Sequence, residues 1–424
     1  MFKNLNLETN CVQAGYEPKT GEARIVPIVQ STTFKYDDAD AVADLFDLKS
    51  DGYFYTRLSN PTVDALEKKI AALEGGVGAI ATSSGQAATF YSITNIAQSG
   101  DNIVAVSNIY GGTFTLLQAT LKRFGIETRF VELNNFEALE NAIDENTKAI
   151  FGETLTNPNV DILDLEKFAQ IAKKHNIVSI VDNTFPTPYL CRPISFGIDI
   201  VTHSSTKYLD GHATSMGGII VDSGKYDWAN GNYPLINDED TNYHGLSFSK
   251  TFGNAAYITR ARAVLLRDIG AVQSPLNAFL TNLGTETLHL RMKQHSENAL
   301  KVAEFLKNHE KIARVKYPGL KDDENHALKQ KYMPNGASGV ISVDIKGSME
   351  DTKKFINSLK LISLVVHVAD VRSHALHPAS MTHRQLSDEK LLEVGINPST
   401  VRLSIGIENA DDIIADLDQA LKQI

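Results

Sequence analysis

Lys207 lies in a stretch whose residue types and spacing point to covalent chemistry. It follows a short apolar strand pattern and the run Ser204-Ser205-Thr206, within residues 199–210. A lysine is a nucleophile only as the free amine, and neighbouring hydroxyls can donate hydrogen bonds to a bound phosphate. The stretch therefore indicates a lysine that forms a Schiff base with a phosphorylated aldehyde. The alternative is an ordinary solvated lysine in a loop rich in serine and threonine.

Strand-like and helical patterns alternate from Asn60 onward. Asn60 is typical of a helix cap, so a helix is expected from Pro61 to a stop at Gly75, and a second helix is expected over 164–176 with Asp164 as its cap. Strand-like runs occur at 78–82, 102–107, 127–132, 148–154, 177–182 and 199–203. This alternation predicts a mainly parallel sheet with helices on both faces. Ligands of such sheets bind beyond the carboxyl ends of the strands.

Polar or aromatic residues follow five of these strands. They are Ser84-Gly85-Gln86, Tyr110, Asn157, Asp182, and Ser204 with Thr206 and Lys207. A glycine that opens a helix lets backbone amides approach an anion at the positive helix end. Each group also has an ordinary interpretation as a turn, a loop or a helix cap. No dinucleotide fingerprint or P-loop motif is present, which disfavours a dinucleotide or a nucleoside triphosphate as ligand.

The sequence divides into three expected parts. Residues 1–58 have no sustained period and are interpreted as an extended arm that contacts a neighbouring subunit, 59–268 as a large ligand-binding domain, and 269–424 as a smaller α+β domain. In the arm, Tyr55 and Arg57 are either a strand edge or an anion clamp. In the last part, Arg402 is either a surface ion-pair partner or a fork for a substrate carboxylate. Residues 222–258 are interpreted as a packed loop between domains, and the alternative is a structured insertion that shapes the mouth of a pocket.

Composition excludes several classes of function. The formal charge of −10 disfavours nucleic-acid binding, and no apolar run is long enough to span a membrane. Two cysteines, Cys11 and Cys191, cannot form a disulfide framework, so a reducing cytoplasm is expected. Four histidines, at 367, 374, 377 and 383, match no familiar zinc spacing, and no metal site is expected.

Taken in order, the motifs resemble the Cys/Met-metabolism family of pyridoxal 5'-phosphate (PLP) enzymes. The resemblance covers nearly the whole chain and is carried by Tyr55-x-Arg57, Asn60-Pro61-Thr62, Ser84-Gly85, Tyr110-Gly111-Gly112-Thr113, Asn157-Pro158, Asp182-Asn183-Thr184, Ser204-x-Thr206-Lys207-Tyr208, His377-Pro378-Ala379-Ser380 and Arg402-Leu403-Ser404. It implies an α/β fold of the aspartate-aminotransferase type (fold type I), with a mainly parallel seven-stranded sheet and a smaller C-terminal α+β domain.

The same resemblance implies roles for individual residues. Lys207 would hold PLP as a Schiff base, Asp182 would keep its pyridine nitrogen protonated, and Tyr110 would stack on the ring. Other residues have implied binding roles: Ser84, Gly85, Gln86, Ser204 and Thr206 for the phosphate, Tyr55 and Arg57 for the phosphate of a neighbouring subunit's cofactor, and Asn157, Ser373 and Arg402 for the substrate carboxylate.

Within the family, the sequence is most similar to the sulfhydrylase branch that uses O-acetylhomoserine. That likeness implies a γ-replacement in which sulfide or a small thiol displaces acetate, giving homocysteine or methionine, and a homotetramer with shared active sites. The likeness to this branch is carried by Gln86, where many cystathionine enzymes have Met, and by the stretches Asp227-Trp228-Ala229-Asn230-Gly231, Tyr243-His244-Gly245-Leu246 and His367-Val368-Ala369-Asp370-Val371-Arg372-Ser373. Two further positions point away from the lyases: Arg372, where lyases commonly have Glu, and Gly112, where methionine γ-lyases commonly have Cys. The alternative is a cystathionine or methionine γ-lyase of the same family.

Overall fold

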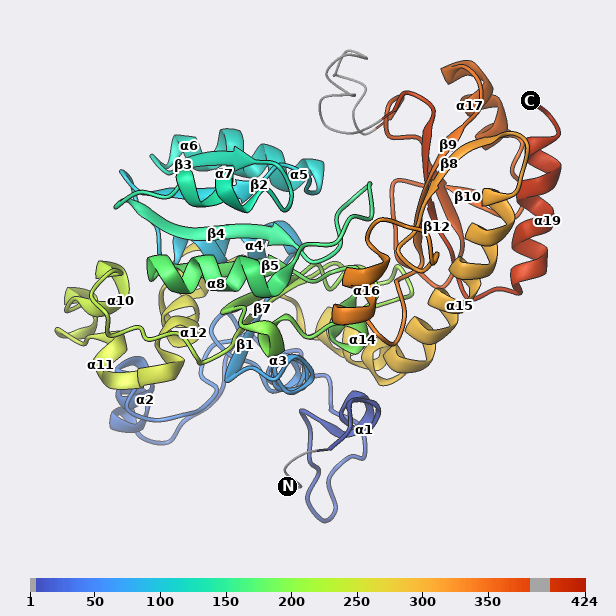
Figure 1. Ribbon diagram of the computed structural model, residues 1–424. Helices are drawn as coiled ribbons and strands as arrows, with labels where there is room; N and C mark the ends of the chain where they lie inside the picture. The colour runs from blue at the N-terminus through green and yellow to red at the C-terminus, as the bar shows by residue number, and fades with distance from the viewer. Residues whose placement is uncertain (1–4, 382–396) are drawn as a thin grey trace.

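The computed structural model describes residues 5–381 and 397–424. Its larger sheet has seven strands in the order β1-β7-β6-β5-β4-β2-β3, with helices on both faces (Figure 1). The strands are β1 (Gly78–Thr82), β2 (Asn102–Val106), β3 (Glu127–Val131), β4 (Thr147–Glu153), β5 (Val178–Asp182), β6 (Ile200–His203) and β7 (Gly218–Asp222). All six predicted strands are present, each within one residue of its expected limits. The fold class expected from the sequence is thereby confirmed.

Strand β7 was not predicted, and it runs antiparallel to both of its neighbours, β1 and β6. Its apolar run is only Ile219-Ile220-Val221, directly after two glycines. Gly218 is needed there because a Cβ atom on it would lie 2.2 Å from the carbonyl oxygen of Ser84. A short apolar run that begins at a glycine is typical of a turn, so the sequence pattern did not predict this strand.

Helices cover the large sheet and connect its strands. They are α3 (Pro61–Glu74), α4 (Gly85–Thr94), α5 (Gly111–Thr115), η1 (Leu116–Thr120), α6 (Leu121–Arg123), α7 (Phe136–Asn141), α8 (Leu165–His175), α9 (Thr187–Leu190), η2 (Pro193–Phe196), α10 (Pro234–Asn237), η3 (Thr241–Tyr243), α11 (Phe248–Phe252), η4 (Gly253–Ala255), α12 (Ala256–Arg260), η5 (Ala261–Leu266), α13 (Arg267–Ile269) and α14 (Pro275–Glu286). The cap predicted for α3 is confirmed, since the Asn60 side chain accepts from the Thr62 amide and Gly75 ends the helix at φ +81°. Asp164 precedes α8 as expected, but its carboxylate accepts from the Tyr332 hydroxyl and does not cap the helix.

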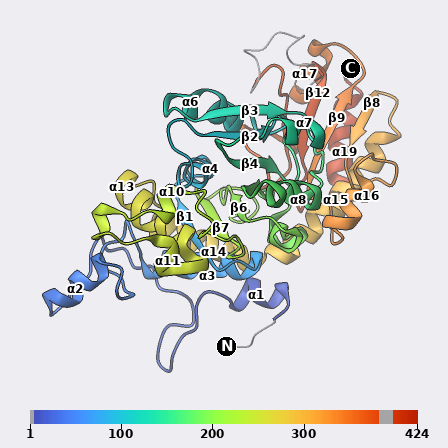
Figure 2. The ribbon, with the colours of Figure 1, turned by 60° about the vertical axis from the view of Figure 1, so that its left-hand side comes forward.

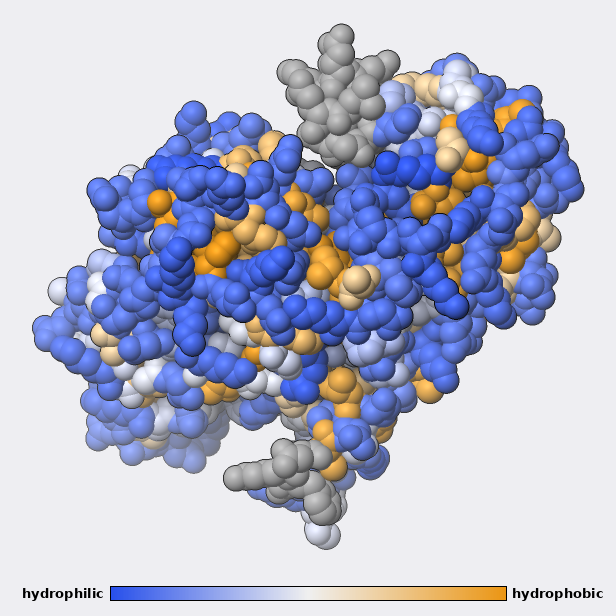
Figure 3. Space-filling model, viewed as in Figure 1, coloured by the Kyte–Doolittle hydropathy of each residue, from blue (hydrophilic) through white to orange (hydrophobic). Residues whose placement is uncertain are grey.

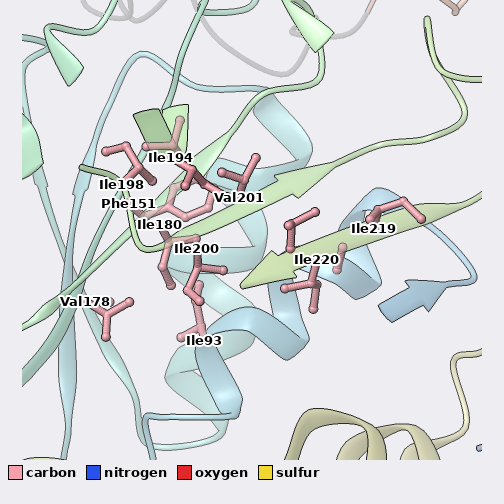
Figure 4. Close-up of a cluster of buried hydrophobic side chains, with 14 of the residues drawn as sticks. Ile93, Phe151, Val178, Ile180, Ile194, Ile198, Ile200, Val201, Ile219 and Ile220 are labelled. Carbon is pink, nitrogen blue, oxygen red and sulfur yellow. The ribbon is translucent and has the colours of Figure 1, made fainter. Parts of the chain in front are cut away.

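The core of this part is formed by aliphatic side chains from the central strands. Ile180 of β5, Ile200 of β6 and Ile220 of β7 are fully buried and lie together with Phe151 of β4 and Ile93 of α4 (Figure 4). β-Branched residues suit strands that are covered on both faces. This packing fixes the strands in register, and with them the residues at their carboxyl ends.

A second sheet lies beside the first, in the order β10-β11-β12-β9-β8 (Figure 1). Its elements are α15 (Leu288–Lys307), β8 (Ile312–Lys316), α16 (His326–Tyr332), β9 (Val340–Ile345), α17 (Met349–Asn357), β10 (Ser363–Leu364), β11 (His374–Leu376), β12 (Thr400–Ser404) and α19 (Ala410–Leu421). Helix α15 joins the two parts, since Leu288 and Met292 belong to the core of the large sheet and Ala299 and Val302 to that of the small one.

The N-terminal arm is not wholly extended, which corrects the expectation from the sequence. It contains α1 (Leu7–Gln13) and α2 (Ala39–Phe46). Asp38 caps α2 by accepting a hydrogen bond from the Asp40 amide. These helices of 7 and 8 residues are shorter than the window over which an apolar face repeats often enough to be recognised. Helix α1 packs on α3, α14 and α15, whereas α2 projects from the body of the molecule (Figure 2).

The segment 222–258 does not lie between the two sheets, as the sequence had suggested. Its α10 and α11 are on the side of the large sheet that faces away from the small one (Figure 1). Trp228 is buried there and stacks on Tyr257 with ring centroids 5.1 Å apart. The aromatic residues of this segment therefore complete the core of the large part.

Polar side chains dominate the face of the molecule seen in Figure 3, with apolar patches between them. Among the residues that the structure describes, no helix is both long enough and apolar enough to cross a membrane.

Candidate active site

A pocket of about 260 Å³ opens where the carboxyl ends of the large sheet's strands meet the small sheet. Most of the residues singled out from the sequence line it. These are Ser84, Gly85, Gln86, Tyr110, Asn157, Asp182, Ser204, Thr206, Lys207 and Arg402. The parallel register explains the convergence, because it brings the ends of β4, β5 and β6 to one edge.

One side of the pocket has the features of an anion cradle. Helix α4 begins at Gly85, and the Ser84 hydroxyl caps it by accepting from the Ala87 amide at 3.1 Å. A Cβ atom on Gly85 would lie 2.7 Å from Cβ of Ser204, so only glycine permits this approach of the helix end to the serine. Amides at a helix N-terminus together with serine and threonine hydroxyls are suitable ligands for a phosphate.

Asp182 ends β5 and projects into the pocket. Its Oδ1 accepts a hydrogen bond from the Thr184 amide at 2.8 Å, which orients the carboxylate. Burial raises the pKa of Asp182, because the charged form loses its hydration. A cationic ring nitrogen facing this carboxylate would favour the charged form and lower the pKa again.

Lys207 is held in the pocket by the short loop that follows β6. Its amide donates to the Ser204 carbonyl, and its own carbonyl accepts from the Gly211 amide. Burial, together with the positive charge of Arg402, lowers the pKa of Lys207 to about 8. A pKa in that range makes a substantial fraction of the amine available as a nucleophile or base near neutral pH.

Arg402 reaches the pocket from β12 of the small sheet. Its Nη1 donates to the Asn157 side-chain oxygen at 3.0 Å, and its Nη2 donates to the His367 carbonyl at 2.9 Å. Burial lowers the pKa of Arg402 to about 10, so the guanidinium stays cationic at neutral pH. The pair Arg402 and Asn157 is therefore placed and charged to bind a carboxylate.

The pocket residues to which the sequence assigned no role include Glu153 and His367. Glu153 ends β4 beside Asp182, and the strand-end rule applied elsewhere could have found it. Its two carboxylate oxygens accept from the Tyr110 amide at 2.7 Å and from the Asn157 amide at 3.1 Å. His367 was noted from the sequence as one of four histidines, but only its tertiary contacts bring it to the pocket.

Three predicted residues do not line the pocket in this chain. Ser373 is buried elsewhere, where its amide and hydroxyl donate to Glu408 and its hydroxyl accepts from the Gly406 amide. Tyr55 and Arg57 lie in a separate depression of the arm, in which the Arg57 guanidinium donates to the Arg267 carbonyl. Their expected contact with a neighbouring subunit's cofactor stays a prediction.

The structure shows the contacts of Gln86, Gly112 and Arg372, the residues that favoured the sulfhydrylase branch of the family. Gln86 donates to the Thr113 hydroxyl at 3.1 Å, and a Cβ atom on Gly112 would lie 2.6 Å from the ring of Tyr110. Arg372 has a largely exposed side chain and pairs with Asp370. No cluster of His, Cys, Asp or Glu side chains able to hold a metal occurs in residues 5–381 and 397–424, and His383 lies outside these ranges.

Comparison with known proteins identifies the family. The model of the Cys/Met metabolism PLP-dependent enzyme family matches residues 8–422. This chain belongs to that family. It is 46% identical to the O-acetyl-L-homoserine sulfhydrylase of Leptospira meyeri, over 100% of this chain and 98% of that protein, and 45% identical to the homocysteine synthase of Schizosaccharomyces pombe, over 98% of each.

A solved structure is similar in fold as well as in sequence. The crystal structure of a putative O-acetylhomoserine (thiol)-lyase from Campylobacter jejuni covers 99% of this chain and 100% of its own, with 44% identity and a TM-score of 0.95. That protein contains a pyridoxyl-lysine phosphate residue.

The pocket fits the cofactor of this family, which is PLP. It combines a lysine with a lowered pKa, a carboxylate at the end of β5 and a cradle that a side chain on Gly85 would fill. The lysine would form the Schiff base with the aldehyde of PLP, the carboxylate would accept a hydrogen bond from its protonated pyridine nitrogen, and the cradle would donate hydrogen bonds to its phosphate. The protein is a PLP-dependent enzyme.

Proposed function

We propose that this enzyme catalyses a γ-replacement on O-acetyl-L-homoserine. Sulfide displaces acetate to give L-homocysteine, and methanethiol in its place gives methionine, so the enzyme acts in sulfur amino-acid biosynthesis. The observation that carries this proposal is the full-length similarity to proteins named O-acetyl-L-homoserine sulfhydrylase and homocysteine synthase, at 46% and 45% identity. The pocket's pairing of a lysine with a carboxylate-binding arginine is consistent with an amino-acid substrate.

The residues of the chain have separate tasks in this reaction. Arg402 and the Asn157 amide bind the substrate carboxylate and so orient the Cα–H bond. Nζ of Lys207 removes the Cα proton, and it then assists removal of a proton from Cβ. When bound, PLP supplies an electron sink for the pair released from Cα, and Asp182 stabilises the protonated form of its ring nitrogen.

Cleavage and bond formation then take place at Cγ. The bond from Cγ to the acetyl oxygen breaks and releases acetate, and the sulfur of the nucleophile bonds to Cγ. Lys207 returns the protons to Cβ and Cα. Tyr110 lies at the mouth of the pocket and is proposed to stack on the cofactor ring. Ser84, Gly85, Gln86, Ser204 and Thr206 are proposed to bind its phosphate, and Ser373 is left out because Glu408 engages its amide and hydroxyl.

We further propose that the active enzyme is a homotetramer in which active sites are shared, with Tyr55 and Arg57 reaching the cofactor phosphate of a neighbouring subunit. Several apolar side chains of the arm are exposed in the single chain, among them Ile25, Ile28 and Phe46, which supports burial against another subunit.

We also propose that the chain consists of an arm over residues 1–58, a large PLP-binding domain over 59–268 and a C-terminal α+β domain over 269–424. Both cysteines are free and buried, which supports the proposal that the enzyme works in a reducing cytoplasm.

A product assay tests the proposed function. The purified enzyme, loaded with PLP, is given O-acetyl-L-homoserine with sulfide, and separately L-cystathionine alone. Homocysteine and acetate from the first mixture, with little 2-oxo acid from the second, are expected. Ammonia and a 2-oxo acid from cystathionine, with no homocysteine from the first mixture, would replace the proposal with a γ-lyase. O-Succinyl-L-homoserine in a third mixture tests the choice of acyl group.

A further inference from the structure

His367 makes two contacts that link the catalytic lysine to the carboxylate-binding arginine. Its ring nitrogen Nδ1 lies 3.3 Å from Nζ of Lys207, a residue 160 positions away in the sequence. Its carbonyl oxygen accepts from Arg402 at 2.9 Å. Arg402 therefore anchors the backbone of the loop between β10 and β11, and the His367 ring of this loop reaches Lys207.

The far side of this ring lies against buried polar groups. His374 of β11 is 5% exposed, and its ring meets that of His367 edge to face at 5.8 Å between centroids. Asp370 lies 3.6 Å from Nε2 of His374. Nε2 of His367 is itself buried, and it has no hydrogen-bond partner among the described residues.

The charges around His367 determine which form of the ring is present. It faces two cations, Lys207 and Arg402, a second imidazole in His374, and one carboxylate in Asp370. Burial and the charge of Lys207 lower the pKa of His367 to about 4, so the ring is neutral at neutral pH. A neutral imidazole with its proton on Nε2 has a free lone pair on Nδ1 that accepts from the lysine amine.

We propose that His367 is a positioning residue for Lys207, accepting at Nδ1 a hydrogen bond from Nζ whenever that nitrogen is not held in the Schiff base. Because the same amine must remove and return protons at Cα and Cβ, a fixed position shortens each proton transfer. The inference rests on the role proposed for Lys207. It does not depend on the acyl group or the sulfur nucleophile.

The first experiment measures Lys207 in the apoprotein. Its acetylation by acetic anhydride is followed by mass spectrometry between pH 6 and 10 in the wild type, His367→Phe and His367→Gln. An acceptor beside an ammonium favours the charged form, so its removal lowers the pKa. The labelling midpoint of His367→Phe should move down by about one pH unit from the wild-type value, while His367→Gln, which keeps an acceptor oxygen, should move less. An unchanged midpoint in His367→Phe would overturn the inference.

The second experiment uses the PLP-loaded enzyme and L-2-aminobutyrate, which has no leaving group at Cγ. Exchange of its Cα proton in D₂O should slow about tenfold or more in His367→Phe and recover in part in His367→Gln. In the sulfhydrylase assay, kcat should fall while KM for O-acetyl-L-homoserine stays within about twofold. His175→Phe, on α8 outside the pocket, is the matched control, and thermal unfolding of each variant checks that it is folded.

The two experiments separate the possible failures. A shifted labelling midpoint with unchanged Cα exchange would mean that the contact exists only in the apoprotein, and the inference would be wrong. Loss of exchange in His367→Phe, in an enzyme that forms no homocysteine from O-acetyl-L-homoserine, would support His367 and contradict the proposed function alone.

Discussion

At the scale of single residues, Arg402 makes several contacts at once through its guanidinium group. Two of its nitrogens donate to Asn157 and to the backbone of His367, and the guanidinium is buried. A lysine carries a compact charge and cannot form both contacts and a fork to a carboxylate. Arg402→Lys should therefore raise KM for O-acetyl-L-homoserine about tenfold or more, while the bound PLP, measured by its absorbance, is retained.

Arg314→Lys is the control for this substitution, because Arg314 is an exposed arginine on β8 of the same sheet. Its KM should equal that of the wild type. A wild-type KM in Arg402→Lys would show that another group binds the carboxylate.

Glu153 is a second residue whose effect can be predicted from its contacts. Its two oxygens accept from the Tyr110 and Asn157 amides, so one buried carboxylate holds both loops. Glutamine has a single acceptor oxygen, and Glu153→Gln leaves one of the two amides without its partner. We expect kcat/KM to fall about tenfold and stability to fall by about 1–3 kcal/mol, measured by steady-state kinetics and denaturant unfolding.

Glu166→Gln on the exposed side of α8 controls for loss of a carboxylate charge and should change neither quantity. Full activity of Glu153→Gln would mean that the two loops keep their positions without this carboxylate.

At the scale of secondary-structure elements, α14 supports the loop that carries Lys207. A Cβ atom on Gly284 would lie 2.2 Å from the carbonyl oxygen of Asp210 and 2.7 Å from that of Leu209. The helix therefore packs directly on the backbone that follows the lysine. Gly284→Ala gains helix propensity of about 1 kcal/mol, but the helix must move away from the loop.

We expect the displacement to outweigh the propensity, with a net loss of about 1–3 kcal/mol and slower recovery of PLP by the apoprotein. Thermal unfolding and the rate of absorbance change on adding PLP measure these effects. Gly284→Ser should be worse than Gly284→Ala, and a stabilised alanine variant would contradict this account of the packing.

At the scale of the whole molecule, the proposed sharing of active sites makes a prediction about hybrids. Lys207→Ala and Arg57→Ala chains with different tags are co-expressed, and oligomers carrying both tags are purified. If Arg57 serves a neighbour's site, each mixed pair contains one site with both residues intact and one with neither. Random mixing then restores activity at about a quarter of all sites.

The measurement is homocysteine formation at limiting PLP, compared with each parent oligomer. Activity clearly above both parents is expected. If the hybrids are no more active than oligomers of Arg57→Ala alone, Arg57 acts within its own chain or has no part in binding the cofactor.

Local signals in the sequence determined six of the seven strands of the large sheet, the cap of α3 and many of the residues that line the pocket. Asn60, Gly75 and the apolar runs act over a few neighbouring residues, so their effect can be read without knowing the fold. The strand-end rule then placed Tyr110, Asp182 and Lys207 at one edge, because parallel strands bring their carboxyl ends together.

Only the tertiary structure decided the antiparallel position of β7, the placement of His367 against Lys207 and the turning of Ser373 towards Glu408. These features rest on contacts between residues far apart in the chain. His367 and Lys207, 160 positions apart, meet because the small sheet packs against the ends of the large one. The geometry of packing between elements, which no local pattern encodes, determined those contacts.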